Sequence, residues 1–417
     1  MRESSQTKAR TEAWLAGSSL VILAALLLGS SMSYLVHGVA FGIASRLLWI
    51  SPWIVVAVFA VVFALPFLFS ELAEWKDLSE LKWMPVWLAL LMPAAALLQS
   101  RGDGLPLKIS DHLLRAILIL SALIGVIHFV FGVNPLREWT GGAVVEYGDI
   151  RRATGLLRNP IPFGHTMGAF FWVAAVGLLI AATEKKLWRL VYAAVLCFCT
   201  FSGGLLSQTR GAWVALAVVA VLSIPFIQGR ARRIWMIGLS VVCVLGSIVM
   251  VISPEVRSRL ISGFDPSQTS NRIRLELWEA NFEILKSHPF GIGYNANDKL
   301  MEDTFDRLGF EHHTWMGHSH NEFVEIAVGS GWIGVGLYLV LTFWILGMTS
   351  QELQKAREAN DSWVTFLLLS SLLIQFYIHT CALTDQLSTP ARYLLSFAWA
   401  IVLVIVVERK LPVPRED

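Results

Sequence analysis

Residues 317–336 read GHSHNEFVEIAVGSGWIGVG, in which histidines and an asparagine lead into an apolar run dotted with glycine. The apolar run continues to residue 348. Because about twenty apolar residues are enough to cross a bilayer as a helix, the segment 321–348 is predicted to span a membrane. A polar cluster thus lies at the end of a predicted span, and its placement there requires an explanation.

The composition of the whole chain supports a membrane fold. Of the 417 residues 55% are hydrophobic and 15% are charged, whereas a soluble domain carries about 25% charged residues. Backbone polar groups in lipid must be satisfied by the chain itself, so only helices or closed barrels span a bilayer. The apolar runs are too long and uniform for barrel strands, which alternate over about ten residues. We therefore predict an all-α polytopic membrane protein.

Eleven apolar runs are clear candidate spans, and one weaker run, 33–48, is a twelfth. The clear runs are 14–32, 51–70, 83–99, 113–132, 161–182, 187–206, 211–228, 234–253, 321–348, 363–384 and 390–407. The twelfth is needed because positive residues favour the cytoplasmic side. The basic N-terminal tail, the link 184–189 and the arginines of 229–233 face the same side only if 33–48 also crosses. About twelve transmembrane helices with both termini cytoplasmic are therefore expected.

This topology divides the chain into three parts. Residues 1–253 carry transmembrane helices 1–9, and the first of them is expected to be retained because no clear cleavage site follows it. Residues 254–320 form a large periplasmic loop that is partly helical. Residues 321–417 carry transmembrane helices 10–12 and a short cytoplasmic tail. The expected location is the bacterial inner membrane, with membrane lipids as partners.

An amphipathic helix is predicted inside the periplasmic loop. The segment 271–289 reads NRIRLELWEANFEILKSHP, with apolar residues at helical spacing and charged residues between them. The proposed apolar face consists of Leu275, Trp278, Phe282 and Leu285. Such a helix is expected to lie against the membrane surface or against the bundle of spans.

Several cationic residues and histidines fall on the predicted outer face. They are Arg152 and Arg158 in RRATGLLRNPIPFGH, Arg210 in SQTRGAW, Arg274 in the loop helix, and His318 and His320 where the loop re-enters the membrane. Each arginine alone could simply extend to the lipid headgroups, and the histidines could simply be solvated. Together they suit a reaction on a phosphorylated lipid, because arginine binds phosphate oxygens and histidine accepts protons near neutral pH.

Zinc is an alternative, because His312, His313, His318 and His320 lie close together in the sequence. However, their spacing is not H-E-x-x-H, and no cysteine is nearby. We therefore expect no metal and no other cofactor. The net charge of +2 indicates no particular partner, and no nucleic acid is expected.

The motifs resemble those of the O-antigen ligase and polymerase superfamily of bacterial inner-membrane glycosyltransferases. The segment from His320 and Asn321 to Gly331 and Gly334 is similar to the family pattern H-N-x9-G-x-x-G. Three upstream segments are similar to further family blocks: RRATGLLRNPIPFG (151–164), TRGAW (209–213), and RLELW (274–278) followed by PFGIGYN (289–295). The resemblance covers roughly residues 150–336, and their order on one membrane face is its most specific feature.

The resemblance implies a metal-independent transfer by an O-antigen ligase on the periplasmic face. The donor would be an undecaprenyl-pyrophosphate-linked glycan, and the acceptor a sugar hydroxyl of the lipid A core. By position, His320 would be the catalytic base, and Arg210 and Arg274 would bind the pyrophosphate. Arg152 and Arg158 would be donor-binding residues of less diagnostic position.

The remaining motif residues have expected supporting roles. Asn321 would either orient His320 or cap the following helix. His318 would only support the site. Gly331 and Gly334 would permit close helix approach, and Gly291 and Gly293 would allow a sharp turn.

Other functions stay open at this point. An O-antigen polymerase would use the same chemistry on a lipid-linked glycan acceptor, and protein O-glycosyltransferases are a third class in the superfamily. A polytopic transporter is an alternative of another kind, because His37, His128, His165 and His379 fall within apolar runs and could carry protons.

Overall fold

All regular structure in the described residues of the computed structural model is helical. The described residues are 94, 98, 105–140, 151–184, 187–252, 254–263, 265, 268–293, 296, 298–312 and 318–410. Within them, 6 helices are long and apolar enough to cross a membrane. These are α6 (Leu105–Phe131), α8 (Pro160–Glu184), α9 (Leu187–Leu206), α11 (Gly229–Ile252), α15 (Glu322–Glu358) and α16 (Ser362–Ala382). The protein is therefore a multi-pass α-helical membrane protein.

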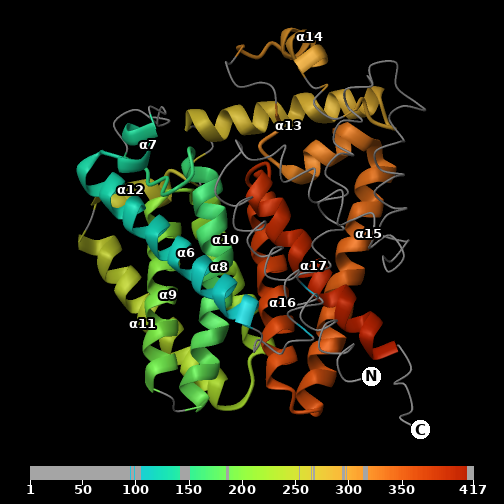
Figure 1. Ribbon diagram of the computed structural model, residues 1–417. Helices are drawn as coiled ribbons and strands as arrows, with labels where there is room; N and C mark the ends of the chain where they lie inside the picture. The colour runs from blue at the N-terminus through green and yellow to red at the C-terminus, as the bar shows by residue number, and fades with distance from the viewer. Residues whose placement is uncertain are drawn as a thin grey trace.

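Two further helices complete the bundle seen in Figure 1: α10 (Arg210–Leu222), which is short, and α17 (Thr389–Lys410), whose apolar part is Pro390–Val406. Each predicted span from 113–132 onward thus coincides with a helix. The predicted spans 14–32, 33–48 and 51–70, and nearly all of 83–99, lie outside the described residues, so the total of twelve stays a prediction.

Two spans differ in length from the sequence prediction. The predicted span 211–228 ends at Leu222 and is followed by a short 3-10 helix, Ile224–Phe226, because Pro225 lacks the N–H that a continuing helix needs. The predicted span 321–348 continues as a helix to Glu358. Its last two turns carry Lys355 and Arg357, which suits the C-terminal end of a helix dipole.

The larger core is built from α6, α8, α10, α15, α16 and α17. The centre of this core depends on the close approach of α8 and α16. A Cβ atom at Gly168 would lie 2.0 Å from the hydroxyl of Tyr377, so only glycine fits there. The buried Tyr377 hydroxyl then donates a hydrogen bond of 3.1 Å to the carbonyl of Gly164. The contact fixes the upper part of α8 against α16.

A second core lies at one end of the bundle. It joins α13 (Thr269–Ser287), α14 (Asp298–Leu308) and the first part of α15. Figure 1 shows α13 lying across the upper end of the bundle, nearly at right angles to the spans. We call this the α13 end. Two further short helices are α7 (Pro135–Thr140) and α12 (Pro254–Ile261).

The helix predicted in the loop is present as α13, but its apolar face was assigned in part to the wrong residues. Leu275 and Phe282 are 49% and 42% exposed, whereas Leu277, Ala280 and Ile284 are buried. The buried stripe is displaced because the second core, and not a lipid surface alone, covers α13. Asn281 also lies in this stripe, and its amide donates a hydrogen bond of 2.7 Å to the carbonyl of Leu277.

The helix α15 is kinked at Gly331, whose φ of 73° and ψ of −177° are not helical. The carbonyls of Val328 and Gly329, freed by the kink, accept hydrogen bonds of 2.9 and 3.1 Å from the N–H groups of Ile292 and Gly293. In return, the N–H of Trp332 donates to the carbonyl of Pro289. Gly331 therefore makes a backbone junction with the turn after α13, rather than the helix–helix contact expected from the sequence.

The turn itself agrees with the sequence prediction. Gly291 and Gly293 have φ of 89° and 96°, which other residues rarely adopt. A Cβ atom at Gly291 would lie 2.6 Å from the carbonyl oxygen of Gly329. Gly291 and Gly293 of PFGIG and Gly331 of GWIG therefore all belong to the same backbone junction.

The first prediction concerns this junction. In a Gly331→Ala variant the new Cβ atom would lie 2.3 Å from the carbonyl oxygen of Pro289, at backbone angles that are essentially restricted to glycine. We expect a loss of about 1–3 kcal/mol in the free energy of unfolding, measured as a lower melting temperature in detergent micelles. Gly336→Ala is the matched control, because nothing lies within 4 Å of its Cβ position in the same helix. Equal melting temperatures for the two variants would contradict the role of the kink.

Candidate functional site

His320 occupies a tightly held segment immediately before α15. Its φ is 50°, an unusual value for a residue with a side chain. The next residue, Asn321, is the N-cap of α15, and its side chain accepts hydrogen bonds from the N–H groups of Phe323 and Val324. Its amide also donates a bond of 3.0 Å to the carbonyl of Leu383. Asn321 therefore caps the helix, as one sequence interpretation expected, and also anchors it to the segment after α16.

Ser319 fixes the other side of His320. The buried Ser319 donates from both its N–H and its hydroxyl to one carboxylate oxygen of Glu325, each at 3.1 Å. The carbonyl of Ser319 accepts a bond of 2.8 Å from the indole N–H of Trp278 on α13. Because both neighbours of His320 are held by hydrogen bonds, the unusual backbone of His320 is stabilised by its surroundings.

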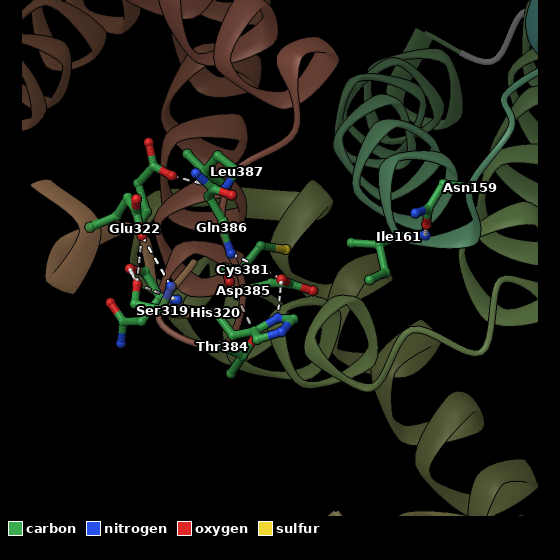
Figure 2. Close-up of polar contacts among 12 residues, drawn as sticks. Asn159, Ile161, Ser319, His320, Glu322, Cys381, Thr384, Asp385, Gln386 and Leu387 are labelled. Carbon is green, nitrogen blue, oxygen red and sulfur yellow. Dashed lines mark hydrogen bonds and ion pairs between the residues drawn. The ribbon is translucent and has the colours of Figure 1, made fainter. Parts of the chain in front are cut away.

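The imidazole of His320 lies beside the carboxylate of Asp385, as Figure 2 shows. The distance from Nδ1 of His320 to Oδ1 of Asp385 is 3.3 Å, and Asp385 is only 6% exposed. Burial raises the pKa of Asp385, but the hydrogen bond from His320 and the charges of His165, His320 and Arg274 outweigh it, so the pKa lies below its usual value. Asp385 is therefore an anion that can hold Nδ1–H of His320 and leave Nε2 free to react.

No sequence motif predicted a role for Asp385. Its segment, TDQLS (384–388), is a short polar link between two apolar runs, which gives no specific signal. Its position at the predicted outer face was the available clue. The link is held at the site by Glu322, whose carboxylate accepts bonds from the Arg392 guanidinium at 3.1 Å and from the N–H of Leu387 at 2.9 Å.

His318 packs against His320, with ring centroids 4.1 Å apart in an edge-to-face arrangement. Burial lowers the pKa of His318, and the nearby charge of His320 lowers it further. His318 is therefore a neutral neighbour at pH 7. Its supporting role in the site stays a prediction.

The two arginines expected to bind pyrophosphate meet at α13. The guanidinium of Arg210, at the start of α10, donates a hydrogen bond of 2.9 Å to the hydroxyl of Ser270. Ser270 precedes Arg274 by four residues, which places both on one face of the helix. Arg274 in turn interacts electrostatically with Asp385 and His318. The structure thus gathers Arg210, Arg274 and His320 at the α13 end.

The two arginines of the earlier motif have different surroundings. Arg152 donates to the carbonyl of Ser207 at 3.0 Å and to the hydroxyl of Thr209 at 3.1 Å. These hydrogen bonds stabilise the turn that immediately precedes Arg210. Arg158 is exposed and lies near Arg137, whose pKa is lowered by burial and then by the charge of Arg158. Donor binding by Arg152 and Arg158 stays a prediction.

A glycine of the TRGAW motif brings Arg210 to the segment that carries Asp385. A Cβ atom at Gly211 would lie 2.2 Å from the hydroxyl oxygen of Thr384. The start of α10 therefore touches the residue immediately before Asp385. This contact gives a physical reason for a glycine after the arginine.

The histidines proposed as zinc ligands are not assembled into a metal site in the described part of the chain. No group of three or more His, Cys, Asp or Glu side chains that could hold a metal ion occurs there. His312 pairs with Asp306 of α14 at 2.8 Å, and His313 lies outside the described residues. That the reaction needs no metal stays a prediction.

The fold and this cluster define a multi-pass membrane protein with an imidazole–carboxylate pair and cationic side chains at one end. Residues 192–339 match the family model described as O-Antigen ligase. The matched segment contains Arg210, Arg274 and His320. The resemblance to the O-antigen ligase superfamily is thereby confirmed.

Three relatives agree with this assignment. The chain is 26% identical over 285 residues to the exopolysaccharide production protein ExoQ of Rhizobium meliloti, covering 64% of this chain and 59% of the relative. It is 22% identical over 339 residues to a general O-oligosaccharyltransferase of Acinetobacter baylyi, covering 76% and 56%. It is 20% identical over 274 residues to the ComP-specific O-oligosaccharyltransferase of the same organism, covering 64% and 47%. The chain thus spans about half the length of these relatives.

The second prediction concerns the contact between Gly211 and Thr384. In a Gly211→Ala variant, the methyl group would displace Thr384 and with it the segment of Asp385. We expect a loss of about 1–3 kcal/mol in stability, seen as a lower melting temperature in detergent. Adding Thr384→Ala removes the hydroxyl and should restore most of the melting temperature. Failure of this rescue, or an equal loss in the Gly238→Ala control whose Cβ position is open, would contradict the contact.

Proposed function

We propose that the protein is a metal-independent O-antigen ligase. It transfers a glycan from undecaprenyl pyrophosphate to a sugar hydroxyl of the lipid A core, at the periplasmic face of the bacterial inner membrane. The observation that carries the proposal is the meeting of Arg210, Arg274 and the His320–Asp385 pair at one end of the bundle. These residues come from three motifs and from one segment without a motif.

The arginines suit the donor. When the bond between sugar and pyrophosphate breaks, negative charge accumulates on the leaving oxygen. Fixed guanidinium groups in a site of low dielectric stabilise this charge without a metal ion. Arg210 of α10 reaches Ser270, which lies one helical turn before Arg274 on α13, so both guanidinium groups could face one diphosphate.

The imidazole suits the acceptor. Asp385 holds Nδ1 of His320, so Nε2 is available to accept the proton of an attacking sugar hydroxyl. The acceptor oxygen then forms a bond to the anomeric carbon, and the bond to the diphosphate breaks with its electrons on the diphosphate oxygen. The carboxylate stabilises the imidazolium that forms, as in other His–Asp pairs.

The distribution of charge supports a periplasmic α13 end. Arg230, Arg232 and Arg233 follow the end of α10 that is opposite Arg210, and Lys355 and Arg357 lie at the end of α15 opposite His320. Positive residues in short links favour the cytoplasm. The site would therefore face the periplasm, where lipid-linked donor and lipid acceptor are both anchored.

The acceptor has alternatives within the same chemistry. An O-antigen polymerase would use a second lipid-linked glycan. The O-oligosaccharyltransferase relatives favour a further alternative, in which the acceptor is not lipid A. Two of the histidines considered for a transporter lie near hydroxyl groups. A ring nitrogen of His128 lies near the hydroxyl of Thr154, and a ring nitrogen of His379 lies near the hydroxyls of Tyr338 and Thr342.

The third prediction tests the arginines. Arg210→Ala and Arg274→Ala should each lower transfer by about a hundredfold or more, because each removes a charge that stabilises the leaving group. Transfer is measured in membranes with lipid-linked glycan and lipid A core, at equal amounts of folded protein. Arg272→Ala is the matched control on the same helix, since Arg272 is 50% exposed and pairs with Glu276 and Glu311. Full activity of either site variant would remove that arginine from the proposal.

The fourth prediction separates the acceptors. Deletion of the gene should abolish all glycan on the lipid A core while lipid-linked polymer remains, as seen by gel analysis of lipopolysaccharide. A core that still carries one repeat unit would indicate a polymerase. An unchanged lipopolysaccharide with loss of glycan from proteins would indicate a protein acceptor.

A further inference from the structure

The carboxylate of Glu322 lies near the site but has no part in the chemistry above. Glu322 is the first residue of α15, two positions after His320, and it is 6% exposed. A buried carboxylate is costly unless a positive charge and hydrogen-bond donors compensate it. The partners that provide this compensation indicate what Glu322 does.

Both partners of Glu322 follow Asp385 in the chain. The Oε2 atom of Glu322 accepts a hydrogen bond of 2.9 Å from the N–H of Leu387, and Figure 2 shows the two residues side by side. The guanidinium of Arg392 donates to both oxygens of the same carboxylate, each at 3.1 Å. Such a two-pronged arrangement gives the pair a defined geometry as well as a favourable energy.

The location of Arg392 also points to this pair. Arg392 lies in the first turn of α17, where the dipole of the helix disfavours a positive charge. Glu322 lies in the first turn of α15, where the dipole favours a negative charge. The ion pair between them offsets the unfavourable position of the arginine. It ties the first turn of α17 to the first turn of α15.

The backbone around Asp385 is thereby held from both directions. Two residues before Asp385, the carbonyl of Leu383 accepts a hydrogen bond of 3.0 Å from the amide of Asn321. Two residues after Asp385, the N–H of Leu387 donates to Glu322. Asn321 and Glu322 are the two residues that directly follow the proposed base. These bonds therefore set how closely the imidazole and the carboxylate of the site approach each other, which is 3.3 Å.

We propose that Glu322, paired with Arg392, is a positioning residue that sets the distance between His320 and Asp385 during the transfer. This inference rests on the proposed function. Glu322 touches no substrate and takes no proton, because the proton of the acceptor hydroxyl goes to Nε2 of His320. The guanidinium of Arg392 binds this carboxylate, and we assign it no part in binding the diphosphate.

The fifth prediction tests this role in the full-length protein in membranes, with lipid-linked glycan as donor and lipid A core as acceptor. Glu322→Ala removes the bonds to Leu387 and Arg392. It should lower kcat about tenfold or more, with KM unchanged for both substrates, because the reacting groups are misplaced while the donor-binding arginines remain. Glu322→Gln keeps one acceptor oxygen and should retain a higher kcat than Glu322→Ala.

The matched control is Glu352→Ala. Glu352 lies in the same helix and is also 6% exposed, but it pairs with Lys355 at the end of α15 opposite the site. Its replacement removes a buried carboxylate and an ion pair without changing the contacts of His320. The control should keep the wild-type kcat, with all rates measured at equal amounts of folded protein.

The coupling between Glu322 and Asp385 gives a readout that a purely structural role would not change. If Glu322 acts only by placing Asp385, its removal has no further consequence once that carboxylate is gone. In an Asp385→Ala background, Glu322→Ala should therefore have almost no further effect on the residual kcat. A general disturbance of the fold would instead lower kcat by the same factor in both backgrounds.

The outcomes separate this role from the proposed function. Wild-type kcat in Glu322→Ala, in a protein that His320→Ala inactivates, overturns the positioning role and leaves the proposed function intact. An equal loss in the wild-type and Asp385→Ala backgrounds also overturns it. Full transfer by His320→Ala overturns the proposed function itself.

A second pair of variants decides the matter if Glu322→Ala does not fold or Asp385→Ala has no measurable transfer. Arg392→Lys keeps the charge that holds Glu322, whereas Arg392→Met keeps only the length of the side chain. A higher kcat for the lysine variant at an unchanged KM supports the proposal. Equal kcat values for the two variants overturn it.

Discussion

The carboxylate of Asp385 is the point on which the arrangement at the α13 end depends. A buried carboxylate is costly unless charges and donors compensate it. Here hydrogen bonds from His320 and from the N–H of Gln386, together with the charge of Arg274 on α13, provide that compensation. Because the buried carboxylate is stable only beside these partners, the segments that carry them must lie together. Removal of one partner would leave the others with an unpaired charge.

The same principle explains why the start of α15 is so rich in buried polar contacts. A buried polar group without a partner is costly, so the polar side chains at the start of α15 pair with other groups of the protein. The carboxylate of Glu322 pairs with Arg392, and that of Glu325 accepts a hydrogen bond from the N–H of Ser319. Asn321 caps its own helix and donates a hydrogen bond to the carbonyl of Leu383. These contacts specify one position for the segment 318–321, which apolar packing alone would fix less precisely.

Precision at this site is combined with local strain. His320 has a positive φ, and α15 is broken eleven residues later at Gly331. The kink lets the first part of α15 lie beneath α13, as Figure 1 shows, while the rest of the helix follows the bundle. A straight helix would carry His320 away from α13 and from Arg274. The strained backbone at His320 and Gly331 therefore allows the imidazole at the start of α15 to lie beside the cationic side chains of α13, which crosses the bundle.

Local patterns in the sequence were enough to predict the fold class, the positions of eight apolar helices, the helix α13, and the residue types of the proposed chemistry. These features depend on local patterns: apolar length, helical periodicity and short motifs. Three features became visible in the three-dimensional structure: the buried face of α13, the backbone junction at Gly331, and the position of Asp385 beside His320. Asp385 lies in no motif and follows His320 by 65 positions. Contacts between segments far apart in the sequence, Gly211 with Thr384 and Asn321 with Leu383, hold it beside His320, and no pattern within one segment of the chain encodes them.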